Sequence, residues 1–363
     1  MLKYCGNAIN QEKVCRMRLR QIENIADSPE WLELWQRDSF QHPWYLPGQL
    51  RVAQARPPSG YYLPEAFRVG FEQTDNRECR PLGLLVDDRA GPILGIPLSI
   101  EVVGSTVRLS AFGRPLCPIE DQDADGHRRK TAAKMIHRRL EQLKQEYQAE
   151  RYHIRDLLFA GRLSCLAEQV LRGGGQAVPF FSQTIDLTLS DHEIRADLRD
   201  SLRNLLSRRR RDLVVTLVTS DNVTAGHRDT LRELHLRQYG RELQTDAGWE
   251  ALRHAVAGGS AFFLFGSIDG EYACGAYFSY SSKYCHYSIA ANDPTRYGAG
   301  LSYLLLWRAI EHSRDLGCRL FEVGDRIYPG QHDHVAAKFH AISHFKAGFG
   351  SRVATRLDVF SKA

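Results

Sequence analysis

The clearest pattern of apolar and polar positions lies in the second half of the chain. Short apolar runs alternate there with segments whose apolar residues recur every three or four positions, the spacing of one helix face. From residue 214 this pattern predicts strand, helix, helix, three strands, helix, strand, helix and a closing strand at 351–360. Upstream, Ser190 and Glu193 form a capping-box pattern at the start of one predicted helix that continues to Leu206.

The first half gives a shorter pattern with the same middle. It predicts a meander of strands over 82–112, a helix at 128–148, a strand at 152–159 and a helix at 161–172. The proline-rich segment 43–64 is expected to be an irregular loop. The shared order predicts two copies of one α/β fold, each a mixed, mostly antiparallel sheet flanked by helices.

Length and composition agree with two globular units. A chain of 363 residues is long for one hydrophobic core, so we expect one domain at 1–183 and another at 184–363. No run of about 18 apolar residues occurs, so no membrane-spanning helix is expected. The start of the chain lacks the apolar stretch of a secretory signal, and the eight cysteines form no Cys-x-x-Cys pair. We therefore expect reduced, mostly buried thiols in a cytoplasmic protein.

The charge balance is mildly basic, and its distribution is more informative than its total. A net charge of +5 does not by itself indicate a nucleic-acid-binding protein. Four consecutive positive charges directly follow a predicted helix, and they are Arg208, Arg209, Arg210 and Arg211. Such a run is either a solvated face or a contact for the phosphates of tRNA or CoA. No aromatic residue is interleaved with it, which argues against a platform for stacking single-stranded bases.

Two glycine-containing segments of the second half are candidates for chemistry. Gly298 and Gly300 precede the predicted helix at 301–316, and a glycine-lined helix start can bind an anion, with Arg296 pairing a phosphate. The alternative is a simple surface loop. The last predicted helix ends at Lys346, before Gly348 and a further glycine. A fixed cation there suits the stabilisation of an oxyanion in acyl transfer, and the alternative is a lysine that favours the helix dipole.

Several segments resemble the FemAB-like proteins of the GNAT acyltransferase superfamily. The similar segments are a strand, acidic helix and Arg-rich run at 184–211, a strand pair at 270–293, and residues 298–301 with 317–324. The most similar segment is 342–350, which reads Ile-Ser-His-Phe-Lys-Ala-Gly-Phe-Gly. The resemblance covers about 184–360 and implies tandem GNAT-like domains. It also implies that Lys346, preceded by Phe345 in the same motif, contacts the donor or the developing oxyanion.

The resemblance also bears on the acyl donor. The relatives include peptidoglycan-bridge aminoacyltransferases, which use aminoacyl-tRNA, and a cellulose-biosynthesis acetyltransferase-like group with an acyl-CoA donor. CoA-binding relatives carry Arg/Gln-x-x-Gly-x-Gly/Ala, whereas the loop at 296–300 is one residue shorter, which weakens the CoA interpretation. Their Phe-Asp-Phe-Gly-Gly motif is replaced here by residues 321–325, where Asp325 adds a carboxylate that is either a substrate contact or drift.

A general base is the remaining requirement for transfer to an amine, which must lose a proton. His286 is a candidate on a predicted strand, on the same face as Tyr284, and the alternative is a half-buried histidine with a structural hydrogen bond. Glu322 and Asp325, at the end of another strand, are candidates for the base or for binding the amine. The histidines at 332, 334, 340 and 344 lack the tight spacing of a zinc site, so no metal is expected.

These features predict an enzyme that moves an aminoacyl or acyl group from an activated ester to an amine, forming an amide. The donor would be aminoacyl-tRNA, which is favoured, or acyl-CoA, with no tightly bound cofactor and no covalent intermediate. The acceptor would be a small molecule or peptide amine, and the acidic loop at Glu120–Asp125 is a candidate for holding its cationic form. The alternatives are an acyl-CoA-dependent N-acetyltransferase and a non-catalytic regulator that binds a ligand or RNA.

Overall fold

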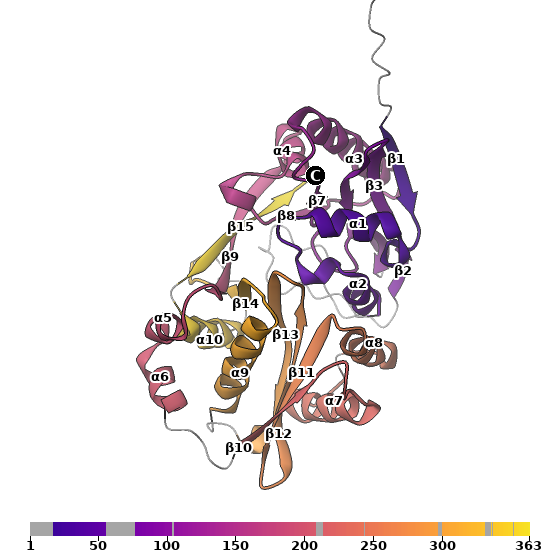
Figure 1. Ribbon diagram of the computed structural model, residues 1–363. Coiled ribbons are helices and arrows are strands. Elements are labelled where there is room, and N and C mark those ends of the chain that lie inside the picture. Colours follow the sequence, from indigo (N-terminus) through magenta and orange to yellow (C-terminus); the bar gives the residue numbers. More distant parts are fainter. Residues whose placement is uncertain are drawn as a thin grey trace, which may run out of the picture.

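The computed structural model describes residues 17–55, 77–103, 105–207, 213–242, 244–296, 300–330, 335, 337–350 and 352–363. Figure 1 shows the first half of the chain stacked on the second, with the C-terminus returning to lie beside the first half. All paired strands in the described part are antiparallel except one pair. The expected α/β class with mixed, mostly antiparallel sheets is therefore confirmed.

The first half holds two small sheets and the helices that cover them. One sheet has the order β1 (Arg18–Ile22), β3 (Gly83–Asp88), β4 (Gly91–Ile96), β7 (Ile119–Glu120). The other has the order β2 (Arg77–Pro81), β5 (Ser99–Val103), β6 (Thr106–Ser110). The helices are α1 (Pro29–Arg37), α2 (Pro47–Gln54), α3 (Gly126–Glu146) and α4 (Cys165–Arg172). The apolar faces of α3 and α4 pack with β3 and β4 into one core, as their helical spacing predicts.

The second half is built on an eight-stranded sheet that also takes in two strands from earlier in the chain. Its order is β10 (Leu213–Val218), β11 (Ala261–Ile268), β12 (Glu271–Tyr280), β13 (Tyr284–Asn292), β14 (Leu320–Arg326), β9 (Gln176–Asp186), β15 (Val353–Phe360), β8 (His153–Asp156). The boundary that we expected between domains, at 183 and 184, falls inside β9. The division into two domains stays a prediction.

Helices cover both faces of this sheet (Figure 1). They are α5 (Asp191–Asp197), α6 (Asp200–Ser207), α7 (Ala225–Tyr239), α8 (Asp246–Ala257), α9 (Leu301–Asp315) and α10 (Ala337–Lys346). The core under α9 includes Leu305 and Phe321, and the core under α7 and α8 includes Trp249 and Phe263. In the described part of the chain, no helix is both long enough and apolar enough to cross a membrane.

The parallel pair, β13 and β14, positions the candidate site. Its register begins with Tyr284 opposite Leu320 and ends with His286 opposite Glu322. Beyond that point β13 continues to Asn292 and β14 continues to Arg326. The register of β14 with β9 shifts between Glu322 and Gly324. The two central strands therefore part at Glu322, and side chains can enter the opening between them.

Two local expectations were wrong. Residues 47–54 of the expected loop form helix α2, because Pro47 stands at its first turn, where a missing N–H costs nothing. The single helix expected from residue 190 is broken into α5 and α6. Leu198 is extended there, and the backbone N–H of Arg199 donates to the carbonyl of Gly348, 3.0 Å away, which draws the chain towards the end of α10.

Candidate active site

Lys346, the last residue of α10, reaches β14 just past the point where its pairing with β13 ends. A Cβ atom built on Gly324 of β14 would lie 3.2 Å from its Cε and closer still to its Nζ, at a distance that real atoms almost never show. The ammonium group therefore rests directly on the backbone of Gly324. Gly324 also has a φ of +116°, which favours glycine. Gly324 makes room for the charge of Lys346 within the sheet.

Asp325, the next residue of β14, is the carboxylate associated with Lys346. Burial lowers the pKa of Lys346, and the carboxylates of Asp325 and Glu322 oppose that shift. Burial likewise raises the pKa of Asp325, against the nearby charge of Lys346. Among the described residues, neither side chain has a hydrogen-bonding partner. The two form a cation and a carboxylate that remain available to a substrate.

Glu322 is instead fully engaged by the protein. Its side chain is only 2% exposed, and its Oε1 lies 2.9 Å from the Nη2 of Arg356. Its Oε2 accepts a hydrogen bond of 2.7 Å from the hydroxyl of Tyr284 and lies 3.4 Å from the Nε2 of His42. Burial alone would raise the pKa of Glu322, but the charge of Arg356 holds it well below its usual range. A permanently ionised, fully partnered carboxylate holds the site together and is a poor base.

His286 is also committed to a structural contact. Its Nδ1 accepts a hydrogen bond of 3.2 Å from the indole Nε1 of Trp44 and lies 2.8 Å from the hydroxyl oxygen of Ser288. Burial lowers its pKa well below the usual value, so the ring is neutral. With Nδ1 accepting from the indole, the proton lies on Nε2. Tyr284 and His286 face the same side of β13, as alternation predicted.

The other members of this cluster were not identified from the sequence. His42 and Trp44 come from the segment before α2, and burial lowers the pKa of His42 to about 4. Arg356 lies on β15, two residues from Asp358, which accepts hydrogen bonds of 2.8 and 2.9 Å from Arg155. An available signal was the pair of charged residues at 356 and 358, which alternate within an apolar closing strand. Charges in such positions are buried only when they are paired.

Phe345 has a packing role. Its ring centroid lies 4.5 Å from that of Tyr303 on α9 and 5.7 Å from that of Phe349. The guanidinium of Arg199 donates to the hydroxyl of Tyr303 at 3.2 Å and contacts the ring nitrogen of His344 at 2.8 Å. These contacts fix the end of α10, and with it the direction of the next side chain, Lys346.

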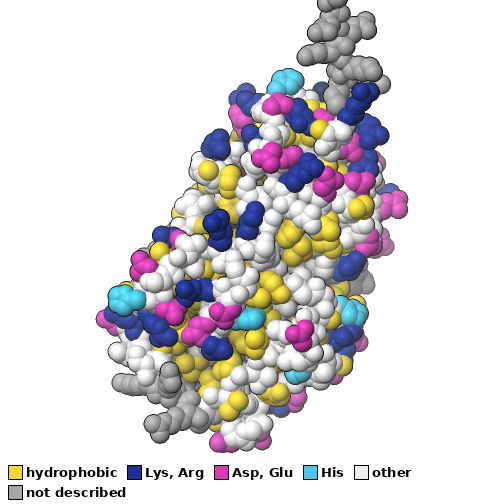
Figure 2. Space-filling model, viewed as in Figure 1, with side chains coloured by type: hydrophobic (Ala, Val, Ile, Leu, Met, Phe, Trp, Pro, Cys, Tyr) yellow, Lys and Arg dark blue, Asp and Glu magenta, His cyan; other side chains and the backbone are white. Residues whose placement is uncertain are grey.

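The expected donor-binding residues that the structure describes fall near the start of α9. Gly300 is the N-cap of α9, with a φ of +69° and no side-chain capping bond, and a Cβ there would lie 2.7 Å from a methyl carbon of Leu205 on α6. Arg296 pairs with Glu271, at 3.1 Å. Figure 2 shows charged and histidine side chains gathered over α5, α9 and α10 on the face drawn.

The remaining donor-binding candidates lie outside the described residues, so their role stays a prediction. They are Gly298 and the four consecutive arginines Arg208, Arg209, Arg210 and Arg211. The helix that precedes the arginines, α6, is described as far as Ser207. Leu205, two residues before the end of α6, lies close to Gly300 at the start of α9.

No group of three or more potential metal ligands comes together within the described part of the chain. Two of the histidines considered above, His332 and His334, lie outside it. The residues brought together at the site are Lys346, Asp325, Glu322 and His286. This arrangement offers one cation, Lys346, and one carboxylate, Asp325, beside the side chains of Glu322 and His286, which are already bound to other residues of the protein.

Comparisons with known proteins bear on the domain family and the fold. Residues 192–333 match the family described as Acetyltransferase (GNAT) domain. No curated protein matches the chain in sequence. Among solved structures, FemX has a TM-score of 0.55 at 10% identity, covering 85% of this chain and 94% of that one.

Two further solved structures share the fold. A tandem GNAT protein from the clavulanic acid biosynthesis pathway has a TM-score of 0.51 at 13% identity, covering 95% of this chain and 98% of that one. The C-terminal domain of a putative lysylphosphatidylglycerol synthetase from Agrobacterium fabrum has a TM-score of 0.54 at 14% identity, covering 75% of this chain and 82% of that one. At these identities the likeness is one of fold. Residues 192–333 therefore match the GNAT acetyltransferase domain family, and the fold of the chain is similar to that of FemX and of a tandem GNAT protein.

Proposed function

We propose that this protein is an N-acyltransferase that moves an aminoacyl or acyl group from an activated ester to an amine. The observation that carries the proposal is the position of Lys346, whose ammonium lies on Gly324, two residues past the last pair of β13 and β14. A donor carbonyl bound there would place its oxygen beside a preorganised positive charge. Such a charge stabilises the oxyanion that forms when an amine attacks, which is worth about 3 kcal/mol for a single donor.

Asp325 is the residue that we assign to the acceptor. An attacking amine forms a C–N bond, the C–O or C–S bond of the donor breaks, and the nitrogen loses a proton. Asp325 has no hydrogen-bonding partner among the described residues, and its pKa is raised mainly by burial. A raised pKa makes a carboxylate a better proton acceptor. Glu322 and His286 then hold the strands that position these two residues.

We favour aminoacyl-tRNA as the donor. The loop at 296–300 is one residue shorter than the phosphate loop of CoA-binding relatives, and Arg296 is engaged with Glu271. Leu205, at the end of α6, packs against Gly300 at the start of α9, and the sequence continues after Ser207 with Arg208–Arg211. Four positive charges that follow this contact suit a polyanionic donor better than a single pyrophosphate.

An acyl-CoA-dependent N-acetyltransferase is the second candidate. The match of residues 192–333 to an acetyltransferase family favours it, as does the start of α9, which carries no side-chain cap. We place either reaction in the cytoplasm. Five cysteines of the described part form no disulfide, which suits a reducing compartment, and they are Cys117, Cys165, Cys274, Cys285 and Cys318.

The test is incubation of the purified protein with charged tRNA or with acyl-CoA and a panel of amines, followed by mass spectrometry of the amide product. Asp325→Asn should lower kcat because the proton acceptor is lost, while Asp315→Asn, at the far end of α9 from Gly300, should have no effect. An amide formed from acyl-CoA alone would favour the second candidate. Donor binding with no amide from any amine would indicate a regulator and contradict the proposal.

A further inference from the structure

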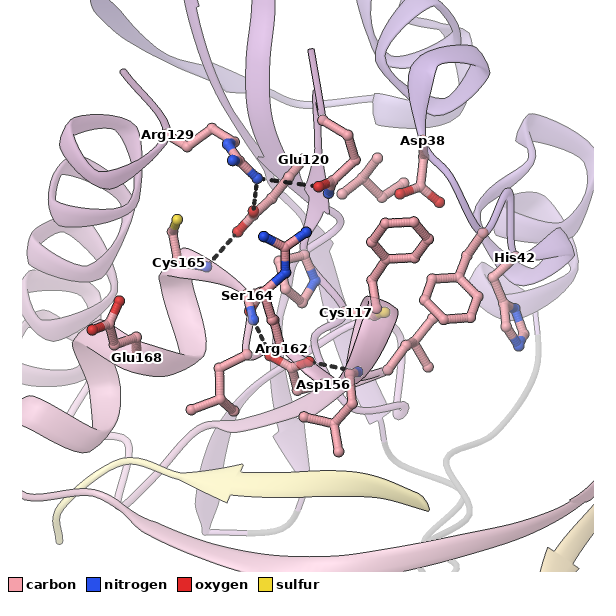
Figure 3. Close-up of a pocket in the computed structure, with 18 of the residues that line it drawn as sticks. Asp38, His42, Cys117, Glu120, Arg129, Asp156, Arg162, Ser164, Cys165 and Glu168 are labelled. Carbon is pink, nitrogen blue, oxygen red and sulfur yellow. Dashed lines mark hydrogen bonds and ion pairs between the residues drawn. The ribbon is translucent and has the colours of Figure 1, made fainter. Parts of the chain in front are cut away.

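The first half of the chain contains a cavity of about 390 Å³ that the proposed reaction does not use. Its walls come from the starts of α3 and α4, the loop after β8 and the segment before α2. Figure 3 shows Glu120, Arg129 and Cys165 on one side of this cavity, with Asp38 and His42 on the other. His42 also contacts Glu322 of the candidate active site, so the cavity and the site share a wall.

Glu120 is the most informative residue of the cavity. It is 4% exposed, and its Oε1 accepts a hydrogen bond of 2.7 Å from the backbone N–H of Cys165. The nearest cation to its Oε2, the Nη1 of Arg129, is 3.9 Å away, and the backbone N–H of Leu166 is a further donor to the carboxylate. Burial raises the pKa of Glu120 to about 7. A buried carboxylate without a close cation favours a ligand that brings a positive charge and a hydrogen-bond donor.

Two more carboxylates face the same space. Asp156 is 2% exposed and accepts hydrogen bonds of 2.8 Å from the backbone N–H groups of Leu158 and Ser164. Asp38 lies on the opposite wall, and burial raises its pKa to about 6. The basic side chains of the lining other than Arg129, namely Lys130 and Arg162, are exposed at the rim. Because charges act more strongly where water is excluded, the acidic interior dominates over this basic rim.

An anion would find few free donors here. The N–H groups of Ser164 and Cys165, which open α4, are already bound by Asp156 and Glu120. At the start of α3, the backbone N–H of Arg128 donates to the side chain of Asp125, the N-cap of that helix, at 2.9 Å. Three of the backbone donors at these two helix starts, those of Arg128, Ser164 and Cys165, are thus occupied by side-chain carboxylates.

The cavity has a counterpart in the second half of the chain. The order β7, α3, β8, α4 in the first half matches β13, α9, β14, α10 in the second, and in that order the cavity and the site of Lys346 lie at corresponding elements. The helix starts differ between the two places. The start of α9 has no side-chain cap, whereas α3 and α4 are capped by Asp125 and Ser164. The position in the second half therefore offers Lys346 beside Asp325, whereas the position in the first half offers several carboxylates beside Arg129.

We propose that this cavity binds an organic cation, with an ammonium or guanidinium group held by Glu120 and Asp38, and that the cation is part of the acceptor. The carboxylates supply both the charge and the oxygens that accept from its N–H groups. Only the second part of the proposal rests on the transferase function proposed above. Binding of a cation is independent of it.

The test is calorimetric titration at pH 8 with putrescine as the cationic probe and inorganic phosphate as the anionic one. Putrescine should bind, and Glu120→Gln should weaken it at least tenfold, because the amide keeps the bond to Cys165 but loses the charge. Glu146→Gln, an exposed change on α3, should leave binding unchanged. If Glu120→Gln does not fold, Asp38→Asn on the other wall should give the same loss.

Three results would overturn the assignment: no putrescine binding by the folded protein, equal binding by the wild type and the folded cavity variant, or binding of phosphate in its place. Lys346→Met separates this proposal from the transferase function, since it should bind putrescine normally. If it does so while the wild type forms no amide from any donor and amine, the transferase proposal fails and the cation site stands. The acceptor role further requires that Glu120→Gln raise the KM for the amine at nearly unchanged kcat.

Discussion

Gly324→Ala tests whether the sheet makes room for the charge of Lys346. The new Cβ would lie within 3.0 Å of the Nζ, so the ammonium must move away by roughly 1 Å to reach an ordinary contact distance. A displacement of about 1 Å in a reacting geometry lowers the rate about a hundredfold. The φ of +116° adds backbone strain of about 1–3 kcal/mol for any residue with a side chain. We therefore expect a folded, somewhat less stable protein with kcat reduced about a hundredfold.

The assay is amide formation under saturating donor, combined with urea unfolding of the same preparation. Gly317→Ala is the matched control, because Gly317 has a φ of +81° and a Cβ there would contact nothing within 4 Å. It should lose stability by a similar amount and keep its kcat. In a Lys346→Met background, Gly324→Ala should lower kcat no further. Equal kcat values for Gly324→Ala and Gly317→Ala would refute the reasoning.

Two further predictions concern the buried ion pairs beneath the site. Arg356→Met should lower the free energy of unfolding by roughly 3–5 kcal/mol, because it leaves the Glu322 carboxylate buried without its cation. The control is Arg352→Met, in the exposed part of the same segment, which should change the free energy of unfolding by roughly 0–1 kcal/mol. Burial alone would raise the pKa of Asp358, but the charge of Arg155 holds that pKa below its usual value near 3.9. The ionised carboxylate therefore stabilises the folded protein above about pH 4, and this stabilisation is lost as the pH falls below that value. The difference in unfolding free energy between the wild type and Asp358→Asn should therefore shrink below about pH 4 in acid titrations, and a constant difference would contradict this.

Much of the second half could be predicted because its signals are local. The strands and helices from residue 213 onward follow periods of two and of about 3.6, and Lys346 is marked by the glycines after it. The first half was harder to predict, because the prolines around α2 suggest a loop. Pro47 is nevertheless compatible with the first turn of a helix.

The partners within the site could not be predicted because they join distant segments. His42 and Glu322 are 280 residues apart in the chain, and Trp44 meets His286 across a similar interval. Such pairing decides which carboxylate is free. Glu322 and Asp325 are equivalent candidates in the sequence, and only the positions of Arg356 and its neighbours show that Glu322 is already engaged.

The central claim is that the charge of Lys346 stabilises the transition state, and steady-state kinetics of Lys346→Met test it most directly. Met keeps most of the aliphatic stem, so packing should change little. The exposed Lys338 on the same helix provides the matched control, Lys338→Met. We predict that kcat falls about 10²–10³-fold for Lys346→Met with the donor KM nearly unchanged, and that Lys338→Met matches the wild type. Unchanged kcat and KM in a folded Lys346→Met variant would contradict the account.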